Sequence, residues 1–265
     1  MSSHFAAIGL GVTDQDSFRA LVAGLLERAD TQQVEGELRR HVWTGGGGAR
    51  LVVETHGRSI AQVLPCLEPA GEPVPVARVA MVDEETARLE LLDRPGGTML
   101  CPLAVELEDR AVLRSRGGTA SEGELRLAAL AERLTLHTGG RQAYDAAQEE
   151  GEIGFAPDYL IPFGLFAPEG AGEDWVPSAH AAFAGEVLLA EVHEGEAGGG
   201  RFHRLRVRTI GGHEVDVAVA GEELTDTPAP GHWVDGEFFL TGSLGLAPAA
   251  SPAAAARKRW WPRRS

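Results

Sequence analysis

Apolar and polar residues alternate with the two-residue period of a β-strand throughout residues 183–244. Glycine and proline turns interrupt this alternation at short intervals, as in a small antiparallel β-domain. The pattern predicts strands over 185–193, 202–209 and 213–219, then a last strand or pair of strands over 231–242. It is the most regular pattern in the chain, and it places a β-domain at residues 179–246.

The hairpin inside this domain has a register that its side chains decide. A three-residue loop at 210–212 satisfies both faces of the hairpin, whereas a two-residue loop would set Asp216 opposite the core residue Val207. The three-residue loop predicts these partners: Val207 with Val215, Leu205 with Val217, Arg208 with Glu214 and Arg206 with Asp216. Acidic neighbours then neutralise most of the arginine charge on this face, which leaves Arg201 and Arg204 free to contact a polyanion.

The first 64 residues predict a mixed α/β segment. Residues 5–12 form an apolar run that predicts a buried strand, and residues 15–29 have the spacing of an amphipathic helix capped by Thr13 or Asp14. Further strands are expected over 34–43, 50–55 and 59–64, with four glycines at 45–48 forming the loop of a hairpin.

Two resemblances follow from these patterns. The run Ile8-Gly9-Leu10-Gly11-Val12-Thr13-Asp14, the helix, and the segment from Trp43 to Glu54 resemble the βαβββ module of the glyoxalase-like vicinal oxygen chelate superfamily over residues 5–64. Members of that superfamily with metal chemistry have a histidine ligand on the first strand and a carboxylate ligand further along the chain. In this chain Glu54 matches the carboxylate and Ala7 replaces the histidine, for which His41 or His56 could substitute. The strands of 183–244 resemble an OB-like small β-barrel.

Residues 72–150 predict strands over 75–82, 86–92 and 102–108 and a short helix over 141–149. The leucine spacing in the segment 125–137 fits a helix, whereas its last residues and the glycines that flank it fit a strand. The strand is favoured for the last residues of the segment. Whether this region completes a second βαβββ module stays open.

A proline- and aromatic-rich segment, the strap, is defined by residues 151–178. Its prolines exclude regular structure, and its aromatics either line a groove or pack on the core, the second being expected. Residues 247–265 form an alanine- and proline-rich linker that is expected to be disordered. It ends in a basic-aromatic tip, a candidate for polyanion contact: Arg257, Lys258, Arg259, Trp260, Trp261, Arg263 and Arg264.

Composition narrows the possible functions. The net charge is −15, and the only cysteines are Cys66 and Cys101, without a CxxC spacing. An acidic protein disfavours non-specific binding of nucleic acid or anionic membrane, and two lone cysteines fit a reducing cytoplasm. No apolar run is long enough to span a bilayer, and the first residues lack the pattern of a signal peptide.

Common catalytic motifs are missing from the sequence. The glycines at 9 and 11 lack the third glycine of a dinucleotide loop, no P-loop lysine follows a glycine-rich loop, and no HExxH motif occurs. The nine histidines have no ligand-pair spacing within one element. Nothing in the sequence pairs a nucleophile with a base.

These patterns predict an α+β protein with four parts: a glyoxalase-like domain at 1–150, the strap at 151–178 between the domains, an OB-like barrel at 179–246, and the tail at 247–265. The expected function is non-enzymatic binding of a partner in the cytoplasm, without cofactor or metal, with a protein partner possible and no integral membrane association. One alternative is a divergent glyoxalase-like metal enzyme or small-molecule binder using Glu54. The other is a nucleic-acid-associated module acting through Arg201, Arg204 and the basic tail.

Overall fold

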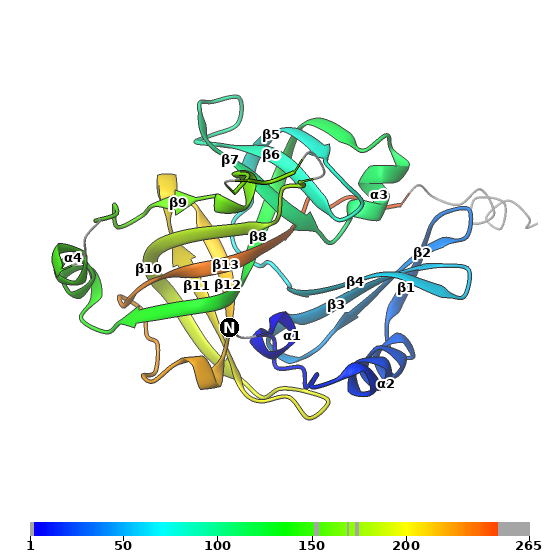
Figure 1. Cartoon of the computed structure of the whole chain (residues 1–265), viewed down its shortest axis with the longest axis horizontal. Helices are drawn as coiled ribbons and strands as arrows, with labels where there is room; N and C mark the ends of the chain where they lie inside the picture. The colour runs from blue at the N-terminus through cyan, green and yellow to red at the C-terminus, as the bar shows by residue number, and fades with distance from the viewer. Residues whose placement is uncertain (1–2, 151–153, 169, 173–174, 249–265) are drawn as a thin grey trace, which may run out of the picture.

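The computed structural model describes residues 3–150, 154–168, 170–172 and 175–248. The chain is mostly β-sheet with few helices (Figure 1). A four-stranded sheet with two short helices forms an N-terminal layer, and a nine-stranded sheet that closes on itself forms the rest. The mixed fold class expected from the sequence is therefore present in its coarse form, with strands dominating.

The N-terminal layer is an antiparallel meander in the order β1-β2-β3-β4. Its elements are α1 (His4–Ala7), α2 (Gln15–Leu26), β1 (Asp30–Glu35), β2 (Leu38–Thr44), β3 (Ala49–His56) and β4 (Ser59–Leu67). The glycine loop between β2 and β3 contains the short helix η1 (Gly46–Gly48). The helix predicted after Asp14 is confirmed, because the Asp14 carboxylate accepts from the Ser17 amide at 2.7 Å and Ser17 closes a capping box.

Two predictions for this layer were wrong. The expected strand at 5–12 is the helix α1, because the Ser3 side chain caps the Ala6 amide and Gly9 turns the chain at a φ of 69°. The expected single strand at 34–43 is a hairpin, because Gly36 adopts a φ of 54° between β1 and β2.

The nine-stranded sheet begins at Val74 and carries the remaining elements. They are β5 (Val74–Met81), β6 (Thr86–Leu92), β7 (Met99–Leu107), α3 (Arg110–Ser115), β8 (Thr119–His137), α4 (Gly140–Glu150), β9 (Leu160–Ile161), β10 (His180–His193), β11 (Phe202–Arg208), β12 (Glu214–Ala220) and β13 (Trp233–Ser243). Short helices η2 (Phe163–Leu165), η3 (Ile210–Gly212) and η4 (Gly221–Glu223) lie in its connections.

Two five-stranded rings share the long strands β8 and β13. The first ring runs β5-β6-β7-β13-β8 and returns to β5, and the second runs β10-β11-β12-β8-β13 and returns to β10. Each ring has one short parallel pairing, β7 with β13 or β12 with β8, and its other pairings are antiparallel. The two rings are therefore built to the same plan, and we call the ring with β5, β6 and β7 the first barrel and the ring with β10, β11 and β12 the second barrel.

The halves of the chain repeat each other within this plan. In each half a three-stranded meander is followed by a long strand, which pairs back on the first strand of its own meander: β8 on β5, and β13 on β10. Each long strand then completes the ring of the other half. The barrel predicted from residues 179–246 thus takes its fifth strand, β8, from the range 1–150.

Strand β8 explains why residues 125–137 looked ambiguous. Its middle, from Leu127 to Ala131, is buried at every position. Alternate residues face two different cores: Leu127, Ala129 and Ala131 point into the barrels, while Ala128 and Leu130 pack under the N-terminal layer. A strand that is covered on both faces lacks the apolar–polar alternation by which exposed sheets are recognised.

The predicted hairpin register is confirmed. Val207 lies opposite Val215 and Arg208 opposite Glu214, with Gly211 and Gly212 at φ values of 65° and 78° in the loop. Left-handed backbone at both positions is accessible to glycine without strain.

The strap is attached to the second barrel. Trp233 Nε1 donates to the Pro157 carbonyl at 2.8 Å, the Ala184 amide donates to the Tyr159 carbonyl at 3.1 Å, and β9 pairs with β10. Helix η2 contacts both β10 and β7, so the strap crosses from one barrel to the other.

Candidate functional site

Glu54 is fully buried and is held by two arginines. Arg110 Nε donates to Oε1 at 3.1 Å, and Arg114 forms an ion pair with Oε2. Arg110 also donates to Glu106 at 2.8 Å. Both carboxylate oxygens are therefore engaged in joining β3 to the segment after β7, which suits a structural ion-pair network rather than a metal ligand.

The structure does not bring His41 and His56 to Glu54. His41 lies opposite Val53, so it occupies the other face of the sheet, where its ring contacts Thr31 at 2.9 Å and Thr55 at 3.0 Å. His56 is exposed at the end of β3. The three residues expected from the glyoxalase-like resemblance do not form a common site.

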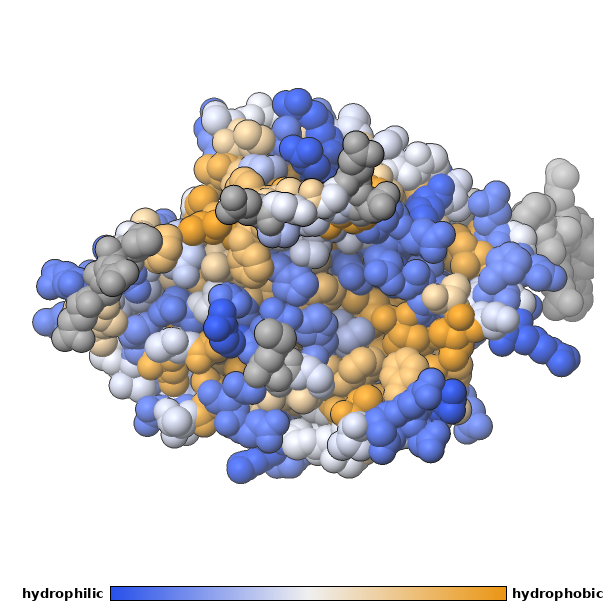
Figure 2. Space-filling view, viewed as in Figure 1, coloured by the Kyte–Doolittle hydropathy of each residue, from blue (hydrophilic) through white to orange (hydrophobic). Residues whose placement is uncertain are grey.

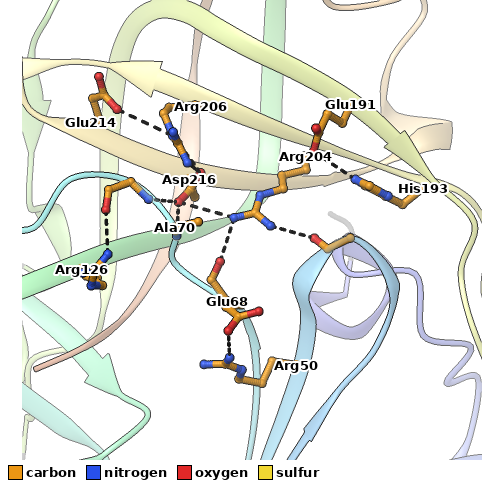
Figure 3. Close-up of polar contacts among 12 residues, drawn as sticks. Arg50, Glu68, Ala70, Arg126, Glu191, His193, Arg204, Arg206, Glu214 and Asp216 are labelled. Carbon is orange, nitrogen blue, oxygen red and sulfur yellow. Dashed lines mark hydrogen bonds and ion pairs between the residues drawn. The ribbon is translucent and has the colours of Figure 1, made fainter. Parts of the chain in front are cut away.

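Arg204 is not free, contrary to the expectation from the sequence. Its guanidinium donates to the Gly47 carbonyl at 3.2 Å and the Glu68 carbonyl at 2.9 Å, and lies 3.7 Å from Asp216 (Figure 3). Arg206 donates to Asp216 at 3.2 Å. The arginines of β11 thus attach the N-terminal layer to the second barrel.

Asp216 is the centre of that junction. It is fully buried and accepts from the amides of Ala70 and Gly71 at 2.6 and 2.7 Å, in addition to Arg206 (Figure 3). One carboxylate on β12 therefore fixes the connection from β4 to β5.

Of the other predicted polyanion contacts, only Arg201 lies within the described residues. Arg201 is exposed and lines a cavity of about 460 Å³ together with the acidic residues Glu222 and Asp226. The basic tip at 257–264 lies outside the described residues.

A different cluster joins three distant segments. Within the described ranges, His4, Glu132 and His180 are the only group of three or more His, Cys, Asp or Glu residues whose ligand atoms lie close enough to hold a metal ion. His4 Nε2 lies 3.0 Å and His180 Nε2 lies 3.3 Å from the same oxygen, Glu132 Oε1. The Glu132 side chain is only 12% exposed.

Each member of the cluster is positioned by its own element. Glu132 is the unpaired residue of a β-bulge, since Ala131 pairs with Phe238 and Arg133 with Glu237. A bulge redirects its extra side chain and is frequent beside functional sites. Glu132 stays on the face of Ala128 and Leu130, where it meets both histidines, and the bulge shifts the alternation of the residues that follow it.

The two imidazoles are oriented by neighbouring rings and a hydroxyl. His4 stacks on Phe239 with a centroid distance of 4.2 Å, and His180 meets the same ring edge-on at 5.5 Å. Ser178 Oγ lies 3.0 Å from His180 Nδ1. Nε2 of each ring is thereby turned towards Glu132.

A cavity of about 500 Å³ opens beside the cluster. Apart from His4 and Glu132, it is lined by apolar residues, one serine and two acidic residues: Phe5, Val63, Leu64, Pro65 and Phe239, with Ser3, Glu85 and Glu106. Burial raises the pKa of the Glu106 carboxyl, although the nearby Arg110 opposes this. The cavity thus combines apolar walls with carboxyl groups.

The strap presents aromatic side chains to solvent, and one of them contacts the cluster. Phe155, Phe163 and Phe166 are exposed, Phe166 to 63%, and Phe163 stacks on His180 at 6.0 Å. The expectation that the strap buries its aromatics is wrong for these three residues. Figure 2 shows apolar side chains gathered along β4 and α2 and again beside the strap, with polar side chains between.

Both cysteines are free and occupy buried positions. Burial raises the pKa of Cys66 well above its ordinary value and that of Cys101 to about 11. Both thiols are therefore neutral at physiological pH, which opposes a nucleophilic role.

Nothing in the sequence pattern indicated the cluster. His4 comes one residue before the strand expected at 5–12, Glu132 lies in the ambiguous segment 125–137, and His180 lies five residues before the strand expected at 185–193. The bulge at Glu132 depends on the pairing of β8 with β13, whose residues at this point lie more than 100 positions apart in the sequence.

No known protein family, curated protein or solved structure matches this chain. Within the part of the chain that the structure describes, every helix is too short or too polar to cross a bilayer.

Proposed function

We propose that this chain is a non-enzymatic binding protein, and that the exposed face of the strap receives a partner protein. The observation that carries this proposal is the exposure of Phe155, Phe163, Phe166 and Val176 on one short segment. Exposed aromatics on a segment anchored to a rigid barrel are typical of recognition surfaces.

Charge favours one kind of partner. The chain has a net charge of −15, and Glu85, Glu106 and Glu132 line the cavity beside the histidine cluster, which Phe163 of the strap contacts through His180. A partner segment that carries apolar side chains flanked by lysine or arginine complements both features. Nucleic acid is disfavoured, because Arg204 is engaged within the protein.

The finer fold assignment belongs to the same proposal. We propose that both rings are OB-like barrels, supported by their five strands, their single parallel closure and the helix α3 between β7 and β8. For the N-terminal layer, the meander β1-β2-β3-β4 gives the glyoxalase-like assignment less support, because the expected first strand is missing from residues 5–12. An OB-like architecture by itself assigns no ligand.

The proposal is tested with a fluorescein-labelled peptide that alternates arginine with tryptophan, and with a counterpart that has glutamate in place of arginine. Fluorescence anisotropy should show binding of the basic peptide alone, weakening as salt rises. The double variant Phe163→Ser/Phe166→Ser should weaken it at least about tenfold, since each aromatic contact contributes on the order of 1 kcal/mol or more.

The matched control is Ile60→Ser/Met99→Ser, which removes two equally exposed apolar side chains away from the strap. It should bind the basic peptide as the unchanged protein does. Equal loss in both double variants, or equal binding of the acidic peptide, would overturn the proposal.

A further inference from the structure

We propose that His4, Glu132 and His180 form a binding site for a divalent first-row transition metal ion such as Zn²⁺. Nε2 of each histidine and Oε1 of Glu132 would be the ligand atoms. The site stands independently of partner binding at the strap, because it rests on the geometry of these three side chains alone.

The separations between the candidate ligand atoms suit a metal ion. Zinc bonds to nitrogen and oxygen are about 2.0–2.2 Å long, so adjacent ligands of a tetrahedral ion lie roughly 3.3–3.6 Å apart. The two histidine-to-glutamate separations are 3.0 and 3.3 Å, and the three atoms lie within 4.8 Å of one another. Small side-chain rotations are sufficient to place an ion between them.

The hydrogen bonding of His180 is that of a metal ligand. A ligating imidazole needs its Nε2 lone pair free, so its Nδ1–H must donate elsewhere, and Ser178 Oγ is the acceptor for His180. Phe239 fixes the planes of both rings. The rings therefore lose little freedom when an ion binds.

The chemistry of the set selects the ion. Two imidazoles and one carboxylate suit zinc, iron or nickel, whereas magnesium and calcium prefer oxygen ligands throughout. Three protein ligands also leave a coordination position open. Because His4 and Glu132 line the 500 Å³ cavity, that position would face a space that water or another small neutral ligand could enter.

The bulge at Glu132 is a second observation that supports a functional role for the cluster. A regular β8 would continue its pairing with β13 through residue 132, and the bulge instead leaves Glu132 out of the ladder. The site also ties α1 to β8 and β10, so an ion would join the N-terminal layer to the second barrel.

The test uses the full chain, freed of any affinity tag and stripped with a chelator. Titration calorimetry with Zn²⁺ should show one equivalent bound, and Co²⁺ should give visible d–d absorption bands. Glu132→Gln and His180→Asn should each weaken Zn²⁺ binding more than about tenfold, since even outer partners of a metal site contribute that much.

His4→Gln is a second variant, because His4 lies in a four-residue helix outside the barrels and its replacement leaves their strands paired. It should lose binding while keeping the circular dichroism spectrum and unfolding midpoint of the metal-free protein. His56→Asn is the control and should bind Zn²⁺ normally. The proposal would be overturned if the unchanged protein bound no stoichiometric Zn²⁺ in the titration, or if His4→Gln and His180→Asn both bound Zn²⁺ normally.

Discussion

Replacing Asp216 by asparagine should separate the N-terminal layer from the second barrel. Asp216 is fully buried, and its two oxygens divide their work: Oδ2 accepts from the Ala70 and Gly71 amides, and Oδ1 accepts from Arg206. Asparagine has one oxygen and one amino group, so it can serve only one of these sets. The other set then loses its acceptor on residue 216, because an amino group cannot accept a hydrogen bond.

The magnitude follows from the hydrogen bonds that are lost. A hydrogen bond to a charged group contributes about 1.5–3 kcal/mol, and a buried charge that loses its partner costs about 3–5 kcal/mol. Asp216→Asn should therefore lower the free energy of unfolding by about 3 kcal/mol, whichever way the amide turns.

Urea unfolding followed by circular dichroism measures this loss as a lower midpoint at constant slope. Hydrogen exchange gives a local measurement, because the amides of Ala70 and Gly71 should lose protection before the strands of the barrel do.

Glu214→Gln is the matched control, with the same change in charge two residues away on β12. Its ion pair with Arg206 spans 3.7 Å and is partly exposed, so its loss should cost less than about 1 kcal/mol. If the two variants unfold at the same urea concentration, the reasoning about the Asp216 junction is wrong.

Three further predictions concern stability. Gly236→Ala should lower the unfolding midpoint strongly, because its Cβ would lie 2.1 Å from the Arg133 carbonyl oxygen. Gly24→Ala is the comparison: Gly24 is exposed in α2, a Cβ there would have no atom within 4 Å, and the change should raise the free energy of unfolding by about 0.5–1 kcal/mol. A lower stability of Gly24→Ala would contradict this. Asp14→Ala should lower the midpoint of thermal unfolding through loss of the α2 cap, and an unchanged midpoint would refute the role of the cap. Burial, and to a lesser extent the charge of Arg201, lower the pKa of His203 in the folded protein. As the pH falls below about 6.5, His203 is therefore protonated in the unfolded chain before it is protonated in the folded protein, and the free energy of unfolding decreases. His203→Gln should therefore show a smaller loss of stability than the unchanged protein between pH 7.5 and 5.5, and identical pH profiles would contradict the assignment.

The sequence by itself determined the local elements whose cause is local. Asp14 and the apolar spacing that follows it gave α2, and the strand at 86–92 has the predicted bounds. The charges of β11 and β12 gave the hairpin register, because a one-residue slip would bury a carboxylate against a core valine. Local propensity failed at residues 5–12, where an apolar run that also suits a strand begins with a helix cap.

Only the tertiary structure decided how the strands close and where the candidate site lies. Each ring contains the long strand of the other half, β8 or β13, and the local sequence pattern does not indicate this exchange. A strand that is covered on both faces lacks the apolar–polar alternation from which its pairing could be predicted. His4, Glu132 and His180 come together for the same reason: the pairing of β8 with β13 creates the bulge, and the docking of α1 brings His4 to it. Pairing between distant segments is a property of the whole core, and spacing along the chain does not encode it.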